Sequence, residues 1–570
     1  MLDRTIPKNG NPDMKRFAPL TRRTTLAGLT ALTIAGNATG QTSPASGPFL
    51  HGIASGDPDA TSVVLWTRIT TPSDVEVECE VSTDAAFQNI VWRARQMAIA
   101  DRDFTTKFLA SRLKPGARYH YRFRAGGAVS RAGQTRTLPV GRVERLGIAL
   151  ASCSNFAFGY FNAYDAIAKD TAVDFVLHTG DYIYEYGVDG FGGDVSRKIG
   201  RVHEPAHEIV SLSDYRTRHA QYKSDAGSQD MLAAKPLLAC WDDHESANNP
   251  WAGGAQNHQP DKEGDWAARR AASIQAYYEW MPVREPVPGR TRMQFWRHYS
   301  FGDIATLSTL ETRHTARALQ VDYTPFYTTI TSRADADAME RDRIGAPDRR
   351  LISAEQESDL AAAWANSKQL AQPWRLIGNP MPIARTRVPD IVALGTIPNP
   401  ETQPKPLDAA RELAWKGKWN LPFYPDTWDG YEWARERFYT QARAAGADDL
   451  IFLTGDSHSF WANRLADASG RPTGIELGTA GITSPGDFVE SGFDRATSAK
   501  LDAAFTAHNP EVLWTDNLHQ GYVRLELTRA VGRATFVGLD NIATQRYRTF
   551  PISQWQVVRG AEGLDLKRSS

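Results

Sequence analysis

The chain has few cysteines, no excess of charge of either sign and no apolar run long enough to cross a bilayer as a mature helix. Its 570 residues include only Cys79, Cys153 and Cys240, too few for a disulfide framework even in an exported protein. The 65 basic and 66 acidic side chains nearly cancel, which argues against a nucleic-acid or membrane-binding surface. Neither a Walker loop nor a serine nucleophile elbow is present, so two common hydrolytic machines are excluded.

The N-terminal segment has the features of an export signal rather than of a folded element. Paired arginines at 22–23 precede a moderately apolar run over 26–35, and small residues follow over 36–40. This order predicts a twin-arginine signal, with either Met1 or Met14 as the true start. We therefore expect a periplasmic or secreted protein whose partners include the twin-arginine export machinery. That route carries folded proteins, which suits an enzyme that loads a metal before export.

Composition and the pattern of apolar residues divide the rest of the chain into predicted domains. After a Ser/Pro/Gly-rich linker, short β-forming runs such as 62–68, 75–82 and 118–124 are separated by turn signals. They predict a small β-sandwich of the immunoglobulin or fibronectin kind. The predicted parts are the signal and linker (1–46), the β-sandwich (47–140), a catalytic domain (141–540) and a C-terminal tail without clear period (541–570).

From about residue 145, strand-length apolar runs alternate with stretches of helical period. This alternation predicts a layered α/β domain. We expect helices at 161–169, 214–222, 265–281, 360–370 and 431–445, and two later strands at 521–527 and 533–538 that form a second sheet face. The predicted fold class is therefore α/β, preceded by a β-sandwich.

Four of the apolar runs end abruptly in side chains that bind metals. The runs and the donors that follow them are Ile148–Ala151 with Cys153, Phe175–Leu177 with Asp181 and Tyr184, Leu237–Ala239 with Asp243 and His244, and Leu450–Leu453 with Asp456 and His458. Strands buried on both faces bring their carboxyl ends to one edge of an α/β sheet, where ligands gather. The sequence therefore predicts one metal site assembled from distant segments.

The donor types indicate two different ions. Tyr184 follows Asp181 by three residues, and a phenol of pKa near 10 binds deprotonated only to a strong Lewis acid, with ferric iron the obvious choice. The thiolate of Cys153 and the imidazole of His458 complete a mixed hard and soft donor set. The carboxylates of Asp243 and Asp456 favour a second, hard ion such as calcium, magnesium or manganese. Asp181 is the expected bridge between the two ions.

Two adjacent metals are typical of enzymes that hydrolyse phosphate esters, because together they hold the attacking and leaving oxygens and activate a hydroxide. His244 directly follows Asp243, so it is a candidate to contact the phosphoryl group or to protonate the leaving oxygen. His244 and Asp243 are therefore the candidate catalytic residues.

Several short motifs around these donors occur together. They are Gly180-Asp181, Asp243-His244-Glu245, Gly455-Asp456-Ser457-His458, Ala151-Ser152-Cys153-Ser154, Asp181-Tyr182-Ile183-Tyr184, Trp428-Asp429-Gly430-Tyr431 and Ile482-Thr483-Ser484-Pro485. This set resembles the PhoD-type alkaline phosphatases and phosphodiesterases of the calcineurin-like metallophosphoesterase superfamily, with the Cys153 motif standing where the wider superfamily has Asp-x-His. The resemblance extends from about residue 49 to about residue 540.

The resemblance implies a four-layer α/β/β/α catalytic domain that hydrolyses phosphate mono- and diesters at alkaline pH outside the cytoplasm. It implies Fe³⁺ and Ca²⁺ as cofactors, with Mg²⁺ or Mn²⁺ as alternatives for the second ion. Carried over motif by motif, the iron ligands would be Cys153, Asp181, Tyr184 and His458, and the calcium ligands Asp181, Asp243, Asp456 and a nearby asparagine, Asn248. A loop-capping role for Asn248 and Asn249 is the alternative. Glu311 and the Asn379-Pro380 pair depart from the family pattern, and the second departure leaves substrate preference open.

Two other functions are compatible with the sequence. A phospholipase D-like or teichoic-acid-type phosphodiesterase could use the same scaffold, with pocket width and the C-terminal tail as the distinguishing features. A surface-binding protein with a vestigial metal site belongs to another class, and the intact donor set argues against it. In the main interpretation the partners are small phosphoester substrates, without specific nucleic-acid binding or a transmembrane span, and the protein is a monomer.

Overall fold

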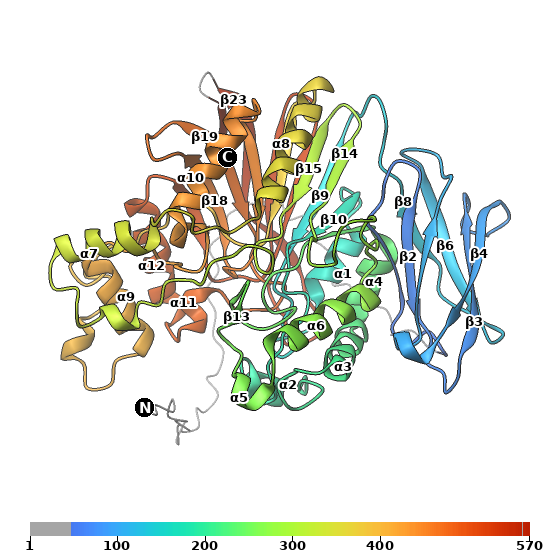
Figure 1. Cartoon of the computed structure of the whole chain (residues 1–570), viewed down its shortest axis with the longest axis horizontal. Helices are drawn as coiled ribbons and strands as arrows, with labels where there is room; N and C mark the ends of the chain where they lie inside the picture. The colour runs from blue at the N-terminus through green and yellow to red at the C-terminus, as the bar shows by residue number, and fades with distance from the viewer. Residues whose placement is uncertain (1–46, 561–562, 570) are drawn as a thin grey trace, which may run out of the picture. The chain divides into compact units, whose positions relative to one another are not determined.

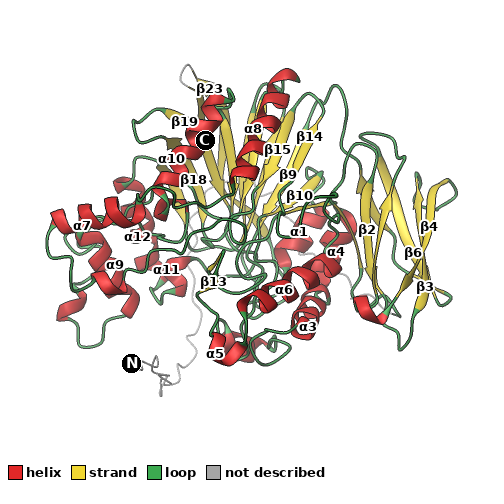
Figure 2. Cartoon of the chain, in the orientation of Figure 1, coloured by secondary structure: helices red, strands yellow, loops and turns green. Residues whose placement is uncertain are grey.

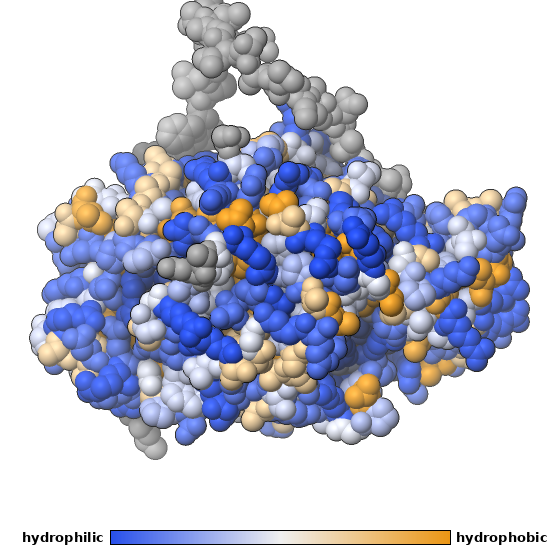
Figure 3. Space-filling view, turned by 90° about the horizontal axis from the view of Figure 1, so that it is seen from above, coloured by the Kyte–Doolittle hydropathy of each residue, from blue (hydrophilic) through white to orange (hydrophobic). Residues whose placement is uncertain are grey.

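The computed structural model describes residues 47–560 and 563–569. The predicted signal and linker, 1–46, lie outside the described residues. Within the described part, no helix combines the length and the apolar content needed to cross a bilayer. On the face seen in Figure 3, hydrophilic side chains predominate and hydrophobic ones occur in small, separate groups.

The N-terminal region is built from short strands, blue in Figure 1. They are β1 (Ile53–Gly56), β2 (Val63–Arg68), β3 (Val75–Ser82), β4 (Ile90–Ala98), β5 (Thr105–Ala110), β6 (Arg118–Ala125), β7 (Ala128–Val129) and β8 (Gly133–Arg136). The three strands predicted here are confirmed as β2, β3 and β6. Strands β3, β4, β6, β7 and β8 form a five-stranded sheet, and a buried cluster that includes Leu65, Phe108 and Phe123 packs β2 and β5 against it.

Strands β1, β2 and β5 belong to a second, larger sheet. Its order is β24-β23-β22-β21-β9-β10-β11-β1-β2-β5, and Gly56 of β1 pairs with Leu237 of β11. The strands not yet defined are β9 (Leu146–Ala151), β10 (Phe175–His178), β11 (Leu237–Ala239), β21 (Gly521–Leu527), β22 (Gly532–Leu539), β23 (Thr549–Gly560) and β24 (Gly563–Arg568). The N-terminal strands are thus hydrogen-bonded to the sheet that carries three of the predicted donor segments.

A seven-stranded sheet carries the fourth donor segment. Its order is β14-β15-β16-β17-β19-β18-β20. The strands are β14 (His298–Phe301), β15 (Ala305–Thr309), β16 (Trp374–Asn379), β17 (Leu450–Thr454), β18 (Phe460–Ala466), β19 (Pro472–Gly478) and β20 (Val512–Asp516). A separate small ribbon pairs β12 (Pro250–Trp251) with β13 (Gly254–Ala255).

Alternate residues of the central strands face opposite cores. In β9, Ile148 and Leu150 belong to a cluster that also contains Ile451 and Leu453 of β17, so the two large sheets pack against each other. Ala149 of β9 instead joins the cluster formed with the helices on the outer side. Burial on both faces explains why these strands are continuous apolar runs rather than alternating ones.

The α-helices of the described residues are α1 (Asn162–Lys169), α2 (Gly193–Ile199), α3 (Leu212–Lys223), α4 (Ala226–Ala234), α5 (Pro260–Glu263), α6 (Trp266–Trp280), α7 (Arg333–Met339), α8 (Ala354–Gln369), α9 (Asp408–Lys418), α10 (Glu432–Ala444), α11 (Asp487–Glu490) and α12 (Arg495–His508). Some of them cover the outer side of each large sheet (Figure 2). Helices α1, α3, α4 and α6 share the core of the ten-stranded sheet, and α8 and α10 that of the seven-stranded sheet. The predicted α/β class and all five predicted helices are confirmed, although α8 begins six residues before its predicted start.

The C-terminal strands differ from the sequence-based expectation. Strand β21 pairs with β9, and β22 with β21, so both extend the first large sheet instead of forming a face of the second. The segment predicted as a tail without period, 541–570, contains β23 and β24, which continue the same sheet. Trp555 and Val557 of β23 are buried in the core between the sheets, and this burial holds the C-terminal strands in place.

Candidate metal centre

The four predicted donor segments follow strands whose ends meet. Strands β9, β10 and β11 are parallel neighbours in one sheet, and β17 lies in the sheet packed against it. Gly180 and Gly455 precede two of the donors, and both positions require glycine because a Cβ would lie 2.4 Å from Asp242 Cβ in one case and 2.2 Å from Ser152 Oγ in the other. The close approach of these backbones brings the donors together.

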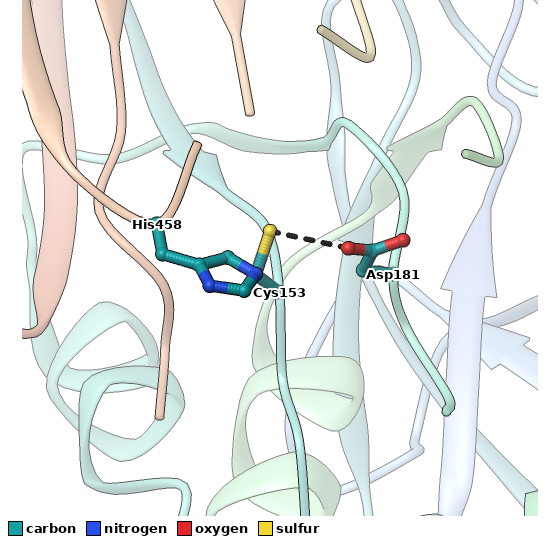
Figure 4. Close-up of side chains that lie close together, drawn as sticks. All are labelled: Cys153, Asp181 and His458. Carbon is teal, nitrogen blue, oxygen red and sulfur yellow. Dashed lines mark hydrogen bonds between the residues drawn. The ribbon is translucent and has the colours of Figure 1, made fainter. Parts of the chain in front are cut away.

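One half of the cluster, which we call the thiol–phenol half, consists of Cys153, Asp181, Tyr184 and His458. Cys153 Sγ lies 3.4 Å from Asp181 Oδ2, and the Tyr184 hydroxyl lies 3.1 Å from the same oxygen. The Tyr184 hydroxyl is also 3.2 Å from His458 Nε2. Figure 4 shows the imidazole of His458 and the carboxylate of Asp181 on either side of the Cys153 sulfur. The Cys153 thiol, the Tyr184 phenol and the His458 imidazole are therefore close enough to share one ion.

The other half, the carboxylate half, consists of Asp181, Asp242, Asp243 and Asp456, each of which has an oxygen within 4.8 Å of the others. Arg313 lies among these acids and was not singled out by the sequence. Its Nε donates to Asp242 Oδ1 at 2.5 Å, and its Nη2 lies 3.5 Å from Asp456 Oδ1 and 3.7 Å from Asp243 Oδ1. This buried guanidinium supplies a fixed positive charge to one half of the cluster.

The backbone is strained where the donors attach. Cys153, Asp181, Asp456 and His458 have φ values of 60°, 56°, 66° and 52°, in the left-handed region that non-glycine residues seldom adopt. Hydrogen bonds hold this conformation: the Cys153 N–H donates to Gly180 O at 3.2 Å, and its carbonyl accepts from Ser484 N–H at 3.3 Å. Such strain costs roughly 1–3 kcal/mol per residue and concentrates at functional sites.

Burial and neighbouring carboxylates shift the pKa of several donors toward the protonated form. Burial, followed by the charge of Asp181, raises the pKa of both Cys153 and Tyr184. Burial and neighbouring carboxylates likewise raise the pKa of Asp181 and Asp456. The pKa of Asp243 is lowered instead, because the charges of His244 and Arg313 outweigh its burial.

The donor set fits metal ions. Among the described residues, the buried oxygens Asp242 Oδ2 and Asp243 Oδ1 accept no hydrogen bond, which is costly unless a cation satisfies them. A bound cation also reverses the pKa shifts of a crowded acid cluster, because it favours each deprotonated donor. The mixed thiol, phenol and imidazole set suits a transition metal, and the carboxylates suit a hard cation.

Two buried glutamates, Glu185 and Glu245, hold residues of the cluster in position through hydrogen bonds. Glu245 accepts N–H bonds from Asp181 at 3.1 Å and from Asp242 at 2.8 Å. Glu185 lies 2.7 Å from His244 Nδ1 and accepts the Asn248 N–H at 2.7 Å. The sequence-based argument assigned neither glutamate a role, although each directly follows a predicted site residue, Tyr184 or His244.

The two asparagines predicted near the site lie differently. The side chain of Asn248, which was placed in the metal set, donates to Gln256 Oε1 at 3.4 Å. The Asn249 N–H donates to Asp243 Oδ2 at 2.9 Å, and its side-chain oxygen accepts from Arg313 at 3.3 Å. Asn249 is thus the asparagine that directly contacts the carboxylate half.

His244 lies between the two halves. Its ring stacks on Tyr184 with centroids 4.2 Å apart, and its Nε2 is 3.9 Å from Asp243 Oδ2. Burial opposes the charged form, but the carboxylates of Asp243, Glu185 and Asp181 outweigh it and raise the pKa of His244. The raised pKa favours the protonated imidazole, which can donate a hydrogen bond to a phosphoryl oxygen.

A cleft of about 750 Å³ adjoins the cluster. Asn249 forms part of its lining, as do Asp487 and Glu490, which lie with His458 in a group whose ligand atoms are within 4.8 Å of one another. The cleft is large enough for a small ester, and Asn249, Asp487 and Glu490 connect its lining to the donors.

Comparison with known proteins defines the class. The sequence matches the PhoD-like phosphatase family over residues 148–536 and the N-terminal domain of PhoD-like phosphatases over residues 35–139. It is 32% identical over 506 residues to alkaline phosphatase D of Bacillus subtilis (strain 168), covering 84% of this chain and 76% of the relative. A solved structure described as PhoD superimposes with a TM-score of 0.72 at 28% identity and covers 92% of both chains.

A phosphoric ester hydrolase is the class of protein that these matches and the donor cluster define. The chain belongs to the PhoD-like phosphatase family. The resemblance inferred from the motifs is therefore confirmed, and so is the enzymatic class. The similarity spans both the N-terminal strands and the sheets that carry the donors.

Proposed function

We propose that the protein hydrolyses phosphate monoesters and diesters outside the cytoplasm with an iron–calcium centre. The observation that carries this proposal is the convergence of a thiol, a phenol and an imidazole on one carboxylate, Asp181. Cys153, Asp181, Tyr184 and His458 would hold Fe³⁺. Asp181, Asp243, Asp456 and an asparagine, Asn248 or its neighbour Asn249, would hold Ca²⁺, with Mg²⁺ or Mn²⁺ as alternatives. When bound, these cations supply the Lewis acidity that activates water and neutralises phosphoryl charge.

The protein's own groups bind and orient the ester. The cationic His244 is placed to donate a hydrogen bond from Nε2 to a phosphoryl oxygen or to the leaving oxygen, while Glu185 fixes its ring through Nδ1. Asp243 lies beside Nε2 and favours the protonated form. Arg313 holds Asp242, Asp243 and Asp456 in register. Proton donation at the leaving oxygen is thus assigned to His244.

The remaining finer assignments belong to the same proposal. We infer that the two packed sheets and their outer helices are the α/β/β/α layers of a catalytic domain that begins at about residue 141 and, beyond the predicted end at 540, includes β23 and β24. We infer that residues 47–140 form the sandwich domain. The matched family segments support this boundary, because one ends at residue 139 and the other begins at residue 148. We also infer export by the twin-arginine route to the periplasm or medium, which rests on the sequence of the first 46 residues, and function as a monomer.

The test combines metal analysis with two chromogenic esters. Purified protein should contain about one iron per chain and should hydrolyse p-nitrophenyl phosphate and bis-p-nitrophenyl phosphate in the presence of calcium. Removal of metals by chelation should abolish both activities, and iron together with calcium should restore them. Hydrolysis of neither ester by the metal-loaded protein would refute the proposal. Full activity in iron-free protein would refute the iron assignment alone.

A further inference from the structure

The charged side chains that line the cleft beside the donors are mostly acidic. Its lining includes a single basic side chain and five acidic ones: Asp322, Glu412, Asp426, Asp487 and Glu490. The basic residue, Lys416, is already engaged, since its Nζ lies 2.6 Å from Glu412 Oε1 and donates to the Phe423 carbonyl at 3.1 Å. The other acids have no second basic side chain in the lining to neutralise them.

These carboxylates extend from the donors along the cleft. Asp487 and Glu490 belong to α11 and lie close to His458. Asp426 is near enough to Asp456 to contribute to the raised pKa of that carboxyl. Asp322 comes from a different part of the chain and also lines the cleft. A ligand that fills the space beyond the phosphoryl group therefore meets negative charge from several segments.

Aromatic rings complete the lining. They are Trp251, Tyr323, Tyr327, Phe423 and Tyr424. The ammonium of Lys416 lies 5.4 Å from the centroid of the Tyr323 ring and 5.9 Å from that of Phe423, so this wall already accommodates one cation over aromatic faces. Tyr327 is 39% exposed and available to a ligand. Aromatic faces combined with carboxylates are the chemistry that recognises ammonium groups.

We propose that the cleft binds the alcohol portion of the ester, and that this alcohol carries a positive charge. The favoured substrates are then phosphate esters of amino alcohols or quaternary ammonium alcohols. Nucleotides and polyphosphates, whose negative charge extends beyond the reacting phosphate, are disfavoured because a cleft of one sign repels ligands of the same sign. This inference rests on the proposed function, because it assumes that the phosphoryl group reacts at the donor cluster.

The test uses two esters that differ in charge but not in shape. Phosphocholine is compared with 3,3-dimethylbutyl phosphate, in which carbon replaces the quaternary nitrogen. The p-nitrophenyl diesters of the same two alcohols provide the comparison for diester hydrolysis. We expect kcat/KM to be about tenfold higher for the cationic ester at low salt, a factor within the range of cation–aromatic contacts. The ratio should fall as salt screens the carboxylates.

Two variants test whether the ratio of kcat/KM for the cationic and neutral esters depends on the carboxylates of the cleft. In an Asp322→Asn/Asp426→Asn double variant, the ratio should fall to about twofold, because two carboxylates are neutralised without loss of volume. The matched control is Glu401→Gln, which removes the charge of an exposed acid outside the lining and should keep the full ratio. Equal kcat/KM for the charged and neutral esters, or an unchanged ratio in the double variant, would overturn the inference. Assays with p-nitrophenyl phosphate and bis-p-nitrophenyl phosphate separate this result from failure of the proposed function, because these two esters report hydrolysis without a cationic alcohol.

Discussion

The thiol–phenol half and the carboxylate half of the donor cluster share Asp181 but differ in how their charge is managed. In the thiol–phenol half, burial raises the pKa of Cys153 and Tyr184, and no lysine or arginine of the described chain forms an ion pair with Asp181. In the carboxylate half, the Arg313 guanidinium is within 3.7 Å of Asp242, Asp243 and Asp456. Of the two halves, only the carboxylate half has an arginine among its donors.

This difference implies different dependence on bound ions. In the thiol–phenol half, a strong Lewis acid favours the deprotonated forms of the Cys153 thiol and the Tyr184 phenol, so that half gains its charge balance from the metal. The carboxylate half is partly balanced by Arg313 before any ion arrives, and a weaker, hard cation is sufficient there. The following predictions test this contrast in order of expected effect.

Replacing the shared residue should affect both halves. Asp181→Asn removes the carboxylate on which Cys153 and Tyr184 converge, and we expect hydrolysis of p-nitrophenyl phosphate to fall by more than about a thousandfold, with loss of both iron and calcium. Elemental analysis and steady-state kinetics measure the two losses. The matched control is Asp165→Asn, a buried carboxylate that pairs with Lys169 at 2.7 Å and should retain both metals. Retention of either ion at full occupancy in Asp181→Asn would contradict the bridging role.

Replacing the built-in cation should affect the carboxylate half in particular. Arg313→Met leaves buried carboxylates without their partner, which typically costs about 3–5 kcal/mol of folding free energy. We expect a lower midpoint of thermal unfolding in calcium-free buffer and partial recovery when calcium is added, since the ion supplies the missing charge. Arg375→Met is the control, because Arg375 pairs with buried Asp449 away from the cluster. Equal calcium rescue of both variants would show that Arg313 has no special relation to the site.

Removing the phenol should affect the thiol–phenol half. Tyr184→Phe deletes the hydroxyl that contacts Asp181, His458 and Ser484, and we expect about a hundredfold loss of activity and loss of any visible phenolate-to-iron absorption. Tyr182→Phe serves as the control: Tyr182 is equally buried, but its hydroxyl lies 3.0 Å from Ser228 Oγ. An unchanged visible spectrum in Tyr184→Phe would remove the phenol from the ligand set.

The parts of the molecule that could be predicted from sequence are those with a local signal. Continuous apolar runs ending in donors identified β9, β10, β11 and β17, because strands buried on both faces leave that pattern. The start of α8 had a signal that was overlooked: Ser353 caps the helix by accepting the Gln356 N–H at 3.2 Å. Strand β23 also had a local signal that was overlooked, because buried and exposed residues alternate along part of the strand.

The partners that organise the site leave no comparable local signal. Arg313 and Asp242 are far apart in the sequence, and only tertiary packing makes them an ion pair. Glu311, which was noted only as a departure from the family pattern, accepts N–H bonds from Arg313 at 2.8 Å and His314 at 2.6 Å and so shapes the loop that presents Arg313. Its role depends on a loop conformation that short-range sequence patterns do not specify.

The smallest predicted effect separates calcium binding from catalysis. Asp456→Asn keeps the size of a side chain in the carboxylate half but removes one negative charge, and it leaves Arg313 with Asp242 and Asp243 as partners. Because the other three carboxylates of this half and the guanidinium persist, we expect about a tenfold increase in the calcium concentration needed for half-maximal activity, with iron content unchanged. Calcium titration of p-nitrophenyl phosphate hydrolysis measures this shift. Asp502→Asn, at a carboxylate that accepts from Asn517 at 2.7 Å, is the control and should leave the titration unchanged. Full activity of Asp456→Asn without calcium, or loss of its iron, would show that the two halves do not bind their ions separately.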